Sequence, residues 1–329
     1  MFSNTLTGAL KLAGTDTFRR SSSKLLGHYG GNVQNPTPSL MKCVVPPRGY
    51  IFLQPDQSGA EALIVAMEAP RGKFRETFDV GMKVHSYTAL QLFAAEIAAE
   101  QGTKAERYKG ISPKTVVAYP EYKKLFTDIK NNSKRYDLGK RVRHARNYGM
   151  GPKTLQLNCL EMSEGTINLS YQESKGFLAT DEEVFPEINY WQAMIRAEAA
   201  KDRTLRNLFG YPKYFGGVWS NSLERKLYAF KPQSTVGIIT ALAITDMYNY
   251  IAAQRLPWYV LNDKHDSFLL TVPDNPEHRN HGAAKCKEYM ERHLVSSSGE
   301  HFQMRSGLSI GHNWAKHDEV TNPNGMKEI

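Results

Sequence analysis

The sequence contains few cysteines and no long apolar run. Its three cysteines, Cys43, Cys159 and Cys286, are far apart and form no Cys-x-x-Cys pair. A zinc site and a disulfide framework are therefore not expected, and a reducing compartment is the natural setting. No apolar run approaches the roughly 20 residues that span a membrane, and residues 1–14 lack the basic start and apolar stretch of a signal peptide. These absences favour a cytoplasmic protein with no membrane partner.

Positive charge is in surplus. The chain has 42 Lys and Arg against 33 Asp and Glu, a net charge of +9, with an ordinary hydrophobic content of 41%. Such a balance favours a polyanionic partner, nucleic acid first. One expected helix, 134–148, carries six cations and few apolar residues. It is either a solvated basic helix or a helix that binds phosphate.

The pattern of apolar residues predicts strands and helices that mix without strict alternation. An α+β fold therefore fits better than a doubly wound parallel sheet. A hairpin is expected at 204–219, around Gly210, and the first 40 residues should be mostly extended. We expect further strands at 50–55, 258–261, 268–272 and 308–311, and helices at 59–69, 82–101, 122–130, 134–148, 182–201, 232–253 and 277–295.

Two aspartates occupy similar places in this pattern. Asp56 comes directly after an apolar strand and before a helix, and Asp266 lies in the polar tip Asn262–Ser267 between two strands. Asp56 alone fits a helix N-cap, and Asp266 alone fits a solvated turn. If both strands belong to one sheet, the two carboxylates can instead converge on divalent cations, which prefer such oxygen ligands. A pair of these ions suits in-line phosphoryl transfer.

Seven segments, spread over nearly the whole chain, occur in a recognisable order. They are TDTFRRSSS with NVQNP (15–23, 32–36), DQSGAE (56–61), GMKVHSYTA (81–89), KRVRHARNYGMG (140–151), RKLYAFKPQST (225–235), KHDS (264–267) and LSIGHNW (308–314). In these segments and their order the sequence resembles the family A DNA polymerases, the group of bacterial DNA polymerase I and many bacteriophage replicases. DQSGAE resembles motif A, KRVRHARNYGMG resembles motif B, and KHDS resembles motif C.

The resemblance implies a palm sheet with helical fingers, and a role for each matching position. Asp56 and Asp266 would hold two Mg²⁺ ions, or Mn²⁺, with the Gln57 carbonyl as a further ligand. Lys140 would contact the triphosphate and protonate the leaving pyrophosphate. His85, Glu61, His144 and Tyr148 would surround the incoming nucleotide, with Glu61 crowding a ribose 2′-hydroxyl. The implied contacts to primer–template DNA are Arg19, Gln34, Arg225, Gln233 and His265.

Several positions depart from the family pattern. Gln57 stands where Tyr is usual, His144 replaces an aromatic residue that stacks on the incoming base, and Ser267 replaces Glu. The usual Arg four residues before Lys140 falls on Tyr136, next to Arg135. A second register, which aligns Asn147–Gly149 with the aromatic-Gly pair, would move the lysine role to His144; the register that keeps Lys140 is preferred.

The resemblance divides the chain into palm (1–90), fingers (91–215) and palm again (216–329), without a thumb or exonuclease domain. We therefore expect a DNA polymerase of phage type that acts in a bacterial or phage-infected cell, with an organelle as a further setting. A separate polypeptide would carry the thumb and exonuclease. The alternatives are a single-subunit RNA polymerase and a non-catalytic nucleic-acid-binding remnant.

Overall fold

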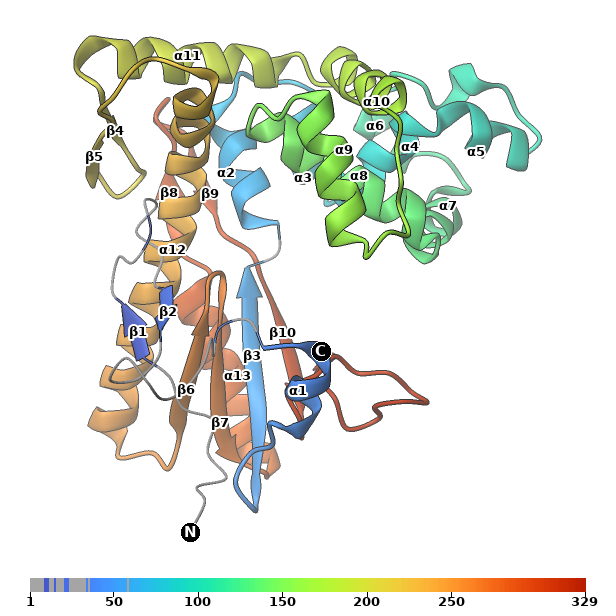
Figure 1. Cartoon of the computed structure of the whole chain (residues 1–329). Coiled ribbons are helices and arrows are strands. Elements are labelled where there is room, and N and C mark those ends of the chain that lie inside the picture. The colour runs from blue at the N-terminus through green and yellow to red at the C-terminus, as the bar shows by residue number, and fades with distance from the viewer. Residues whose placement is uncertain (1–8, 12–14, 16–20, 24–33, 35, 58) are drawn as a thin grey trace. The chain divides into compact units, whose positions relative to one another are not determined.

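The protein consists of two compact units (Figure 1). The structure is a computed structural model that describes residues 9–11, 15, 21–23, 34, 36–57 and 59–329. Unit 1 comprises residues 1–61, 207–209 and 230–329, and unit 2 comprises 62–206 and 210–229. The expected palm (1–90 and 216–329) and fingers (91–215) remain a prediction. The two compact units divide the chain elsewhere, since residues 62–90 and 216–229 group with the middle of the chain.

Unit 1 is built on an antiparallel sheet whose strand order is β11-β10-β3-β7-β6. The expected strands are present but longer. The first, for example, extends through Gln57 instead of ending before Asp56. The α+β class is confirmed. The strands are β3 (Tyr50–Gln57), β6 (Tyr259–Lys264), β7 (Ser267–Pro273), β10 (Ser306–Gly311) and β11 (Lys327–Glu328).

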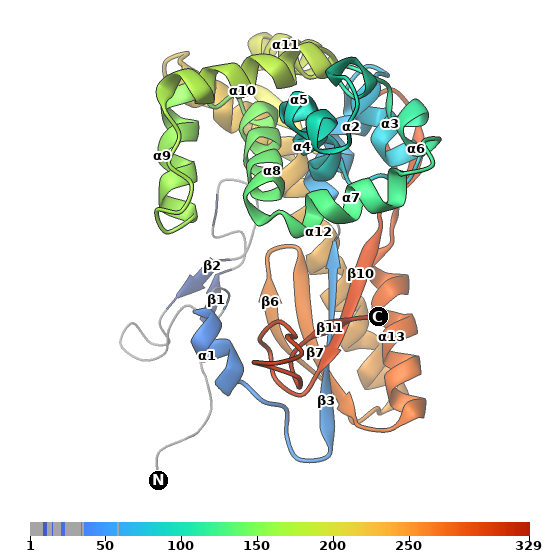
Figure 2. The same ribbon diagram turned by 90° about the vertical axis from the view of Figure 1, so that its right-hand side faces the viewer.

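Both faces of this sheet are covered, so its inner strand β7 is buried over nearly its whole length. Helices α12 (Asn221–Gln254) and α13 (Pro276–Met290) cover one face and contribute Met247 and Cys286 to the core (Figures 1 and 2). A smaller cluster around Phe52 and Trp314 covers the other. Burial on both sides gives β3 and β7 a rigid frame, which matters because their ends carry the two aspartates.

Helix α12 begins earlier than expected. The sequence predicted a start at Pro232, where proline is usual, but the helix runs through it. Gln233 is therefore mid-helix, not in a first turn. By length and composition α12 could also cross a membrane, which the sequence pattern did not indicate. Its residues Ala243 and Met247 belong to the core of unit 1, and a core helix passes the same test.

Unit 2 is mostly helical in its described part. The expected helix 82–101 is two helices, α4 and α5, with the break at Phe93. The expected helix 182–201 covers the end of α10 and nearly all of α11, with the break at Pro186. The helices are α2 (Ala60–Glu68), α3 (Lys73–Asp79), α4 (Val84–Leu92), α5 (Ala94–Glu100), η1 (Ala105–Arg107), α6 (Pro113–Val117), α7 (Tyr122–Asn131), α8 (Ser133–Asn147), α9 (Pro152–Met162), α10 (Tyr171–Val184) and α11 (Glu187–Asp202).

Short two-stranded sheets complete the described elements. The hairpin expected around Gly210 is confirmed. The expected helix 277–295 ends at Met290 and is followed by a strand. The pairs are β1 (Ala9–Lys11) with β2 (Ser21–Ser23), β4 (Thr204–Arg206) with β5 (Pro212–Tyr214), and β8 (His293–Val295) with β9 (His301–Gln303); α1 (Pro38–Cys43) precedes β3.

Candidate active site

The sheet of unit 1 brings Asp56 and Asp266 to neighbouring strands. Asp56 pairs directly with Ser267 in the β3–β7 register, and the Gln57 backbone N–H donates to the Asp266 carbonyl over 3.0 Å. The helix-cap interpretation of Asp56 is wrong, because Asp56 lies within β3 and α2 begins only at Ala60. Asp56 is exposed and Asp266 is half-buried, so both carboxylates are accessible to a ligand.

The turn that carries Asp266 is tighter than the sequence suggested. Strand β6 ends at Lys264 and β7 begins at Ser267, so the turn between them consists of His265 and Asp266. His265 has a φ of +52°, which is uncommon outside glycine, and the Asp266 N–H donates to the Lys264 carbonyl over 2.6 Å. This geometry holds Asp266 in place and makes a loosely solvated hairpin tip a poor description.

Gln57 lies beneath the aspartates and is buried. Its amide nitrogen donates to the Thr240 hydroxyl of α12 over 2.9 Å, and its Oε1 has no hydrogen-bond partner among the described residues. A buried oxygen without a partner is costly and needs an explanation, such as a catalytic role or a bound water or ion. Gln57 follows Asp56 directly at the end of β3, and its backbone N–H donates to Asp266.

Two carboxylates on neighbouring strands suit a hard cation such as Mg²⁺, which takes oxygen ligands and completes its shell with water or phosphate. The described residues contain no group of three or more His, Cys, Asp and Glu side chains that could hold a metal. The donor set therefore fits an ion shared with a phosphate substrate better than one held entirely by the protein.

In unit 2, helix α8 presents a second set of predicted residues. Tyr136, Lys140, His144 and Tyr148 follow one another at intervals of four and therefore share one side of the helix. Lys140 and His144 are exposed, and the His144 ring contacts the buried Tyr148 ring edge-on at 4.7 Å between centroids. The helix ends at Asn147, and Gly149 lies in the turn that follows, with a φ of +66° and with the Tyr228 ring 3.0 Å from where a Cβ would lie.

Most other cations of α8 are bound by partners within unit 2, which neither sequence interpretation, a solvated basic helix or a phosphate-binding helix, included. Arg135 pairs with Glu96 and Glu100 of α5. Arg141 donates to a backbone carbonyl, and Arg143 is fully buried. Lys140, by contrast, forms no ion pair with the described residues. The helix also buries an apolar side that the sequence pattern underestimated: Leu138, Gly139, Val142 and Ala145.

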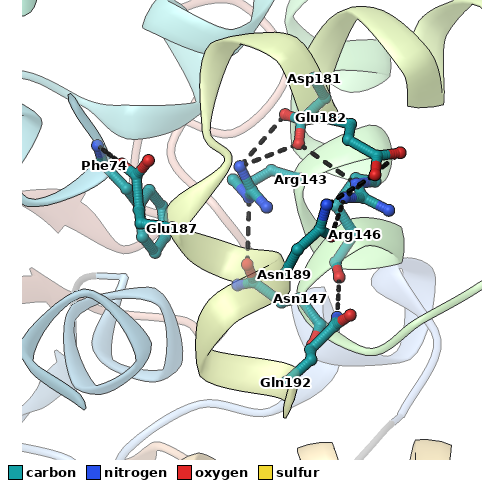
Figure 3. A network of polar contacts seen from close by, with 9 residues as sticks. All are labelled: Phe74, Arg143, Arg146, Asn147, Asp181, Glu182, Glu187, Asn189 and Gln192. Carbon is teal, nitrogen blue, oxygen red and sulfur yellow. Dashed lines mark hydrogen bonds and ion pairs between the residues drawn. The ribbon is translucent and has the colours of Figure 1, made fainter. Parts of the chain in front are cut away.

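The buried arginine belongs to a polar network that sequence reasoning missed (Figure 3). Arg143 contacts Asp181 of α10 at 3.0 Å, and both side chains are at most 1% exposed. The guanidinium packs over the rings of Phe74 and Phe185, and its Nε donates to Asn147. Burial raises the pKa of Asp181 to about 6, although Arg143 and Arg146 oppose the rise.

The same network holds the C-terminal end of α8. Gln192 of α11 donates to the Arg146 carbonyl over 2.7 Å, and Arg146 itself donates to Asn189 (Figure 3). Because helix ends leave carbonyls unsatisfied, these bonds stabilise the last turn and tie α8 to α11. The 38 residues between Arg143 and Asp181 explain why no local pattern revealed the pair.

His85 lies at the closest approach of α4 and α8. A Cβ on Gly139 would be 2.5 Å from the His85 carbonyl oxygen, so glycine is needed for this packing. Burial, with Lys140 and Arg143 nearby, lowers the pKa of His85 to about 3. Its Nδ1 is buried and has no partner among the described residues. The imidazole is therefore neutral near pH 7 and can bind a phosphate only as a hydrogen-bond donor.

The remaining predicted residues are spread over both units. Glu61 lies in the first turn of α2, and Arg225 is exposed near the start of α12. Gln233 is half-buried and Gln34 is buried, so neither is arranged for broad contact with DNA in this structure. Arg19 lies outside the described residues.

Comparison with known proteins gives a likeness of fold. No family model and no curated protein match the chain. A solved structure, the POL domain of Pol1 from M. smegmatis in complex with DNA primer-template and dNTP, matches with a TM-score of 0.66 and 17% sequence identity. The match covers 94% of this chain and 48% of that one, so this chain spans about half the length of its neighbour. The protein has the α+β fold of a DNA polymerase I polymerase domain over nearly its whole length.

Proposed function

We propose that the protein catalyses template-directed DNA synthesis. The primer 3′-oxygen would form a bond to the α-phosphorus of a deoxynucleoside triphosphate as the bond to pyrophosphate breaks. The observation that carries this proposal is the pairing of β3 with β7, which sets Asp56 beside the turn of Asp266. The likeness of fold and the exposed Lys140 of α8 support it.

Unit 1 would supply the reaction centre. Asp56 and Asp266 would hold two divalent cations, Mg²⁺ or Mn²⁺, with the backbone carbonyl of Gln57 as a further ligand. Such ions, when bound, stabilise charge on the attacking and leaving oxygens. The buried sheet holds both carboxylates in place before substrate arrives, which reduces the cost of ordering them during the reaction.

Unit 2 would bind the nucleotide. The Lys140 ammonium is a compact charge for the triphosphate and a proton source for the leaving pyrophosphate. Neutral His85 would donate a hydrogen bond to the same phosphates. His144, held against Tyr148, would stack on the incoming base in place of the usual aromatic residue. Glu61, the last residue of the first segment of unit 1, would disfavour a ribose 2′-hydroxyl.

Primer–template DNA would contact Arg225 and His265, with Arg19, Gln34 and Gln233 as further proposed contacts. We still predict that the protein acts in a bacterial or phage-infected cytoplasm. We also predict that a separate polypeptide carries the thumb and exonuclease, and co-purification from the native cell tests this.

Primer extension by the full chain at low salt tests the proposal against its rivals. We expect addition of the deoxynucleotide that the template specifies, and loss of that addition when a chelator removes divalent cations. Preferential incorporation of ribonucleotides would favour an RNA polymerase. DNA binding without synthesis, unchanged by Asp266→Ala, would favour a non-catalytic binding protein.

A further inference from the structure

The β4–β5 hairpin of unit 2 carries an exposed aromatic and basic surface that the proposed reaction does not use. Between Arg203 and Leu223 the sequence contains three cations and no Asp or Glu. In Figure 1 the hairpin stands at the C-terminal end of α11, while α10 precedes the other end of that helix. It is therefore separated along α11, by about 24 Å at 1.5 Å per residue, from the helices that hold Arg143 and Asp181.

The strand register divides this hairpin into two faces. Arg206 pairs with Pro212 and Thr204 pairs with Tyr214, and directly paired residues share a face. Leu205, on the opposite face, is fully buried, which fixes that face as the inner one. We call the other side the outer face of the hairpin, defined by Thr204, Arg206, Pro212 and Tyr214. Tyr214 is 69% exposed and Arg206 is also exposed.

This outer face is held firmly. Arg206 donates to the Gly210 carbonyl across the turn over 3.0 Å, and the Phe215 N–H donates to the Arg203 carbonyl over 2.8 Å. The Tyr214 ring lies against Gly216, where a Cβ would be 3.4 Å away. Phe215 is buried and anchors the end of β5. The tyrosine ring is therefore displayed on a fixed support.

We propose that the outer face of the hairpin binds single-stranded nucleic acid, with an unpaired base stacked on Tyr214 and a phosphate bound by Arg206. An aromatic ring beside a cation is the arrangement by which proteins hold single strands, since every base has a face that can stack. In a duplex those base faces are covered, so the ring favours unpaired nucleotides. The absence of carboxylates over this segment favours a polyanion over a basic partner.

This inference deepens the proposed function, on which it rests for the identity of the strand: the unpaired template ahead of the primer. Arg206 has five N–H donors and uses one on Gly210, so a phosphate can bind without loss of the hairpin bond. The site would thereby hold the template strand before each of its bases is copied.

Fluorescence anisotropy with the full chain tests the inference. The probes are a labelled blunt duplex and the same duplex with a 5′ overhang of thymidines. We expect Tyr214→Ala to weaken binding of the overhang probe by about tenfold and to leave the blunt duplex unchanged, whereas Tyr214→Trp retains the wild-type affinity for both. Arg206→Gln should reduce the salt slope on the overhang probe by about 0.7, as expected for one lost phosphate contact. Tyr190→Ala is the matched control, because Tyr190 is a comparably exposed tyrosine of the same unit.

Photocrosslinking locates the contact directly. With bromodeoxyuridine in the overhang, trypsin digestion should yield the crosslinked peptide Tyr214–Arg225. Equal affinity of wild type for both probes, an equal loss on both probes in Tyr214→Ala, or crosslinks confined to other peptides would overturn the inference. Extension activity with no effect of Tyr214→Ala would reject the hairpin site alone, whereas overhang preference without extension would reject only the proposed catalysis.

Discussion

The buried pair of Arg143 and Asp181 allows a quantitative test of how α8 is held. Both side chains are withdrawn from water, so removing one leaves the other as an uncompensated buried charge. Such a change typically costs about 3–5 kcal/mol. Asp181→Leu should reach that range, because Arg143 then keeps only Asn147 and two aromatic rings. Arg143→Met should cost less, because Arg146 remains 3.7 Å from Asp181.

The double variant Arg143→Met/Asp181→Leu should be more stable than Asp181→Leu, because it replaces two charges by apolar groups of similar size. Urea unfolding followed by circular dichroism gives the free energies, and hydrogen exchange in α8 peptides localises the effect. The control is Arg135→Met, whose partners Glu96 and Glu100 are more than half exposed, and it should cost at most about 1 kcal/mol. Costs that simply add in the double variant, or single variants that match the control, would refute the reasoning.

Three further predictions concern α8 and His85, the α4 residue that packs against it. Gly139→Ala should lower the free energy of unfolding by about 1–3 kcal/mol, because its Cβ would press on the His85 carbonyl oxygen; unchanged urea unfolding would contradict this. The pKa of His85 is about 3 in the folded protein and 6.5 in the unfolded one. Its contribution to stability is therefore complete above about pH 6.5 and is lost as the pH falls toward 3, a dependence that His85→Gln should flatten. An imidazolium NMR signal from the folded protein at pH 5 would disprove this. Lys140→Ala should raise the KM for deoxynucleotides by on the order of tenfold or more, because it removes a charge-assisted hydrogen bond to phosphate. The control Lys134→Ala should leave the KM unchanged, and equal effects of the two variants would count against a specific phosphate contact.

The meeting of the two aspartates could be foreseen from the sequence, because each follows an apolar strand and strand ends of one sheet can lie together. The exact setting could not. Strand β3 continues for two residues beyond the expected end, since pairing with β7 and β10 supports Asp56 and Gln57 in extended form. Asp is a favourable helix N-cap residue, but these strand pairings place Asp56 in β3 instead.

Helix boundaries could be predicted from the sequence only in part. The break at Phe93 has neither residue, and the apolar spacing continues across it. At Pro232 the opposite error occurred: the helix continues through proline because Leu227 and Phe230 before it and Val236 after it are all buried. Tertiary packing decided both cases.

The basic helix α8 shows why composition alone misassigns charge. Its cations suggested either a solvated face or a phosphate-binding one, yet Arg135 and Arg143 neutralise carboxylates that lie 35 or more residues away in the sequence. Only contacts of that kind separate a structural arginine from an available lysine such as Lys140.

The central claim is that Asp56 and Asp266 together form the reaction centre. Its most direct test is primer extension in magnesium by the wild type, Asp56→Asn, Asp266→Asn and the control Asp128→Asn, an exposed aspartate of α7. Asn is nearly the same size as Asp, so folding should be retained while one charged ligand is lost. We expect extension by the wild type and the control to be similar, and each of the other two variants to be slower by about 10²–10³-fold, the scale of losing one preorganised electrostatic group. Wild-type rates in Asp56→Asn or Asp266→Asn would contradict the claim.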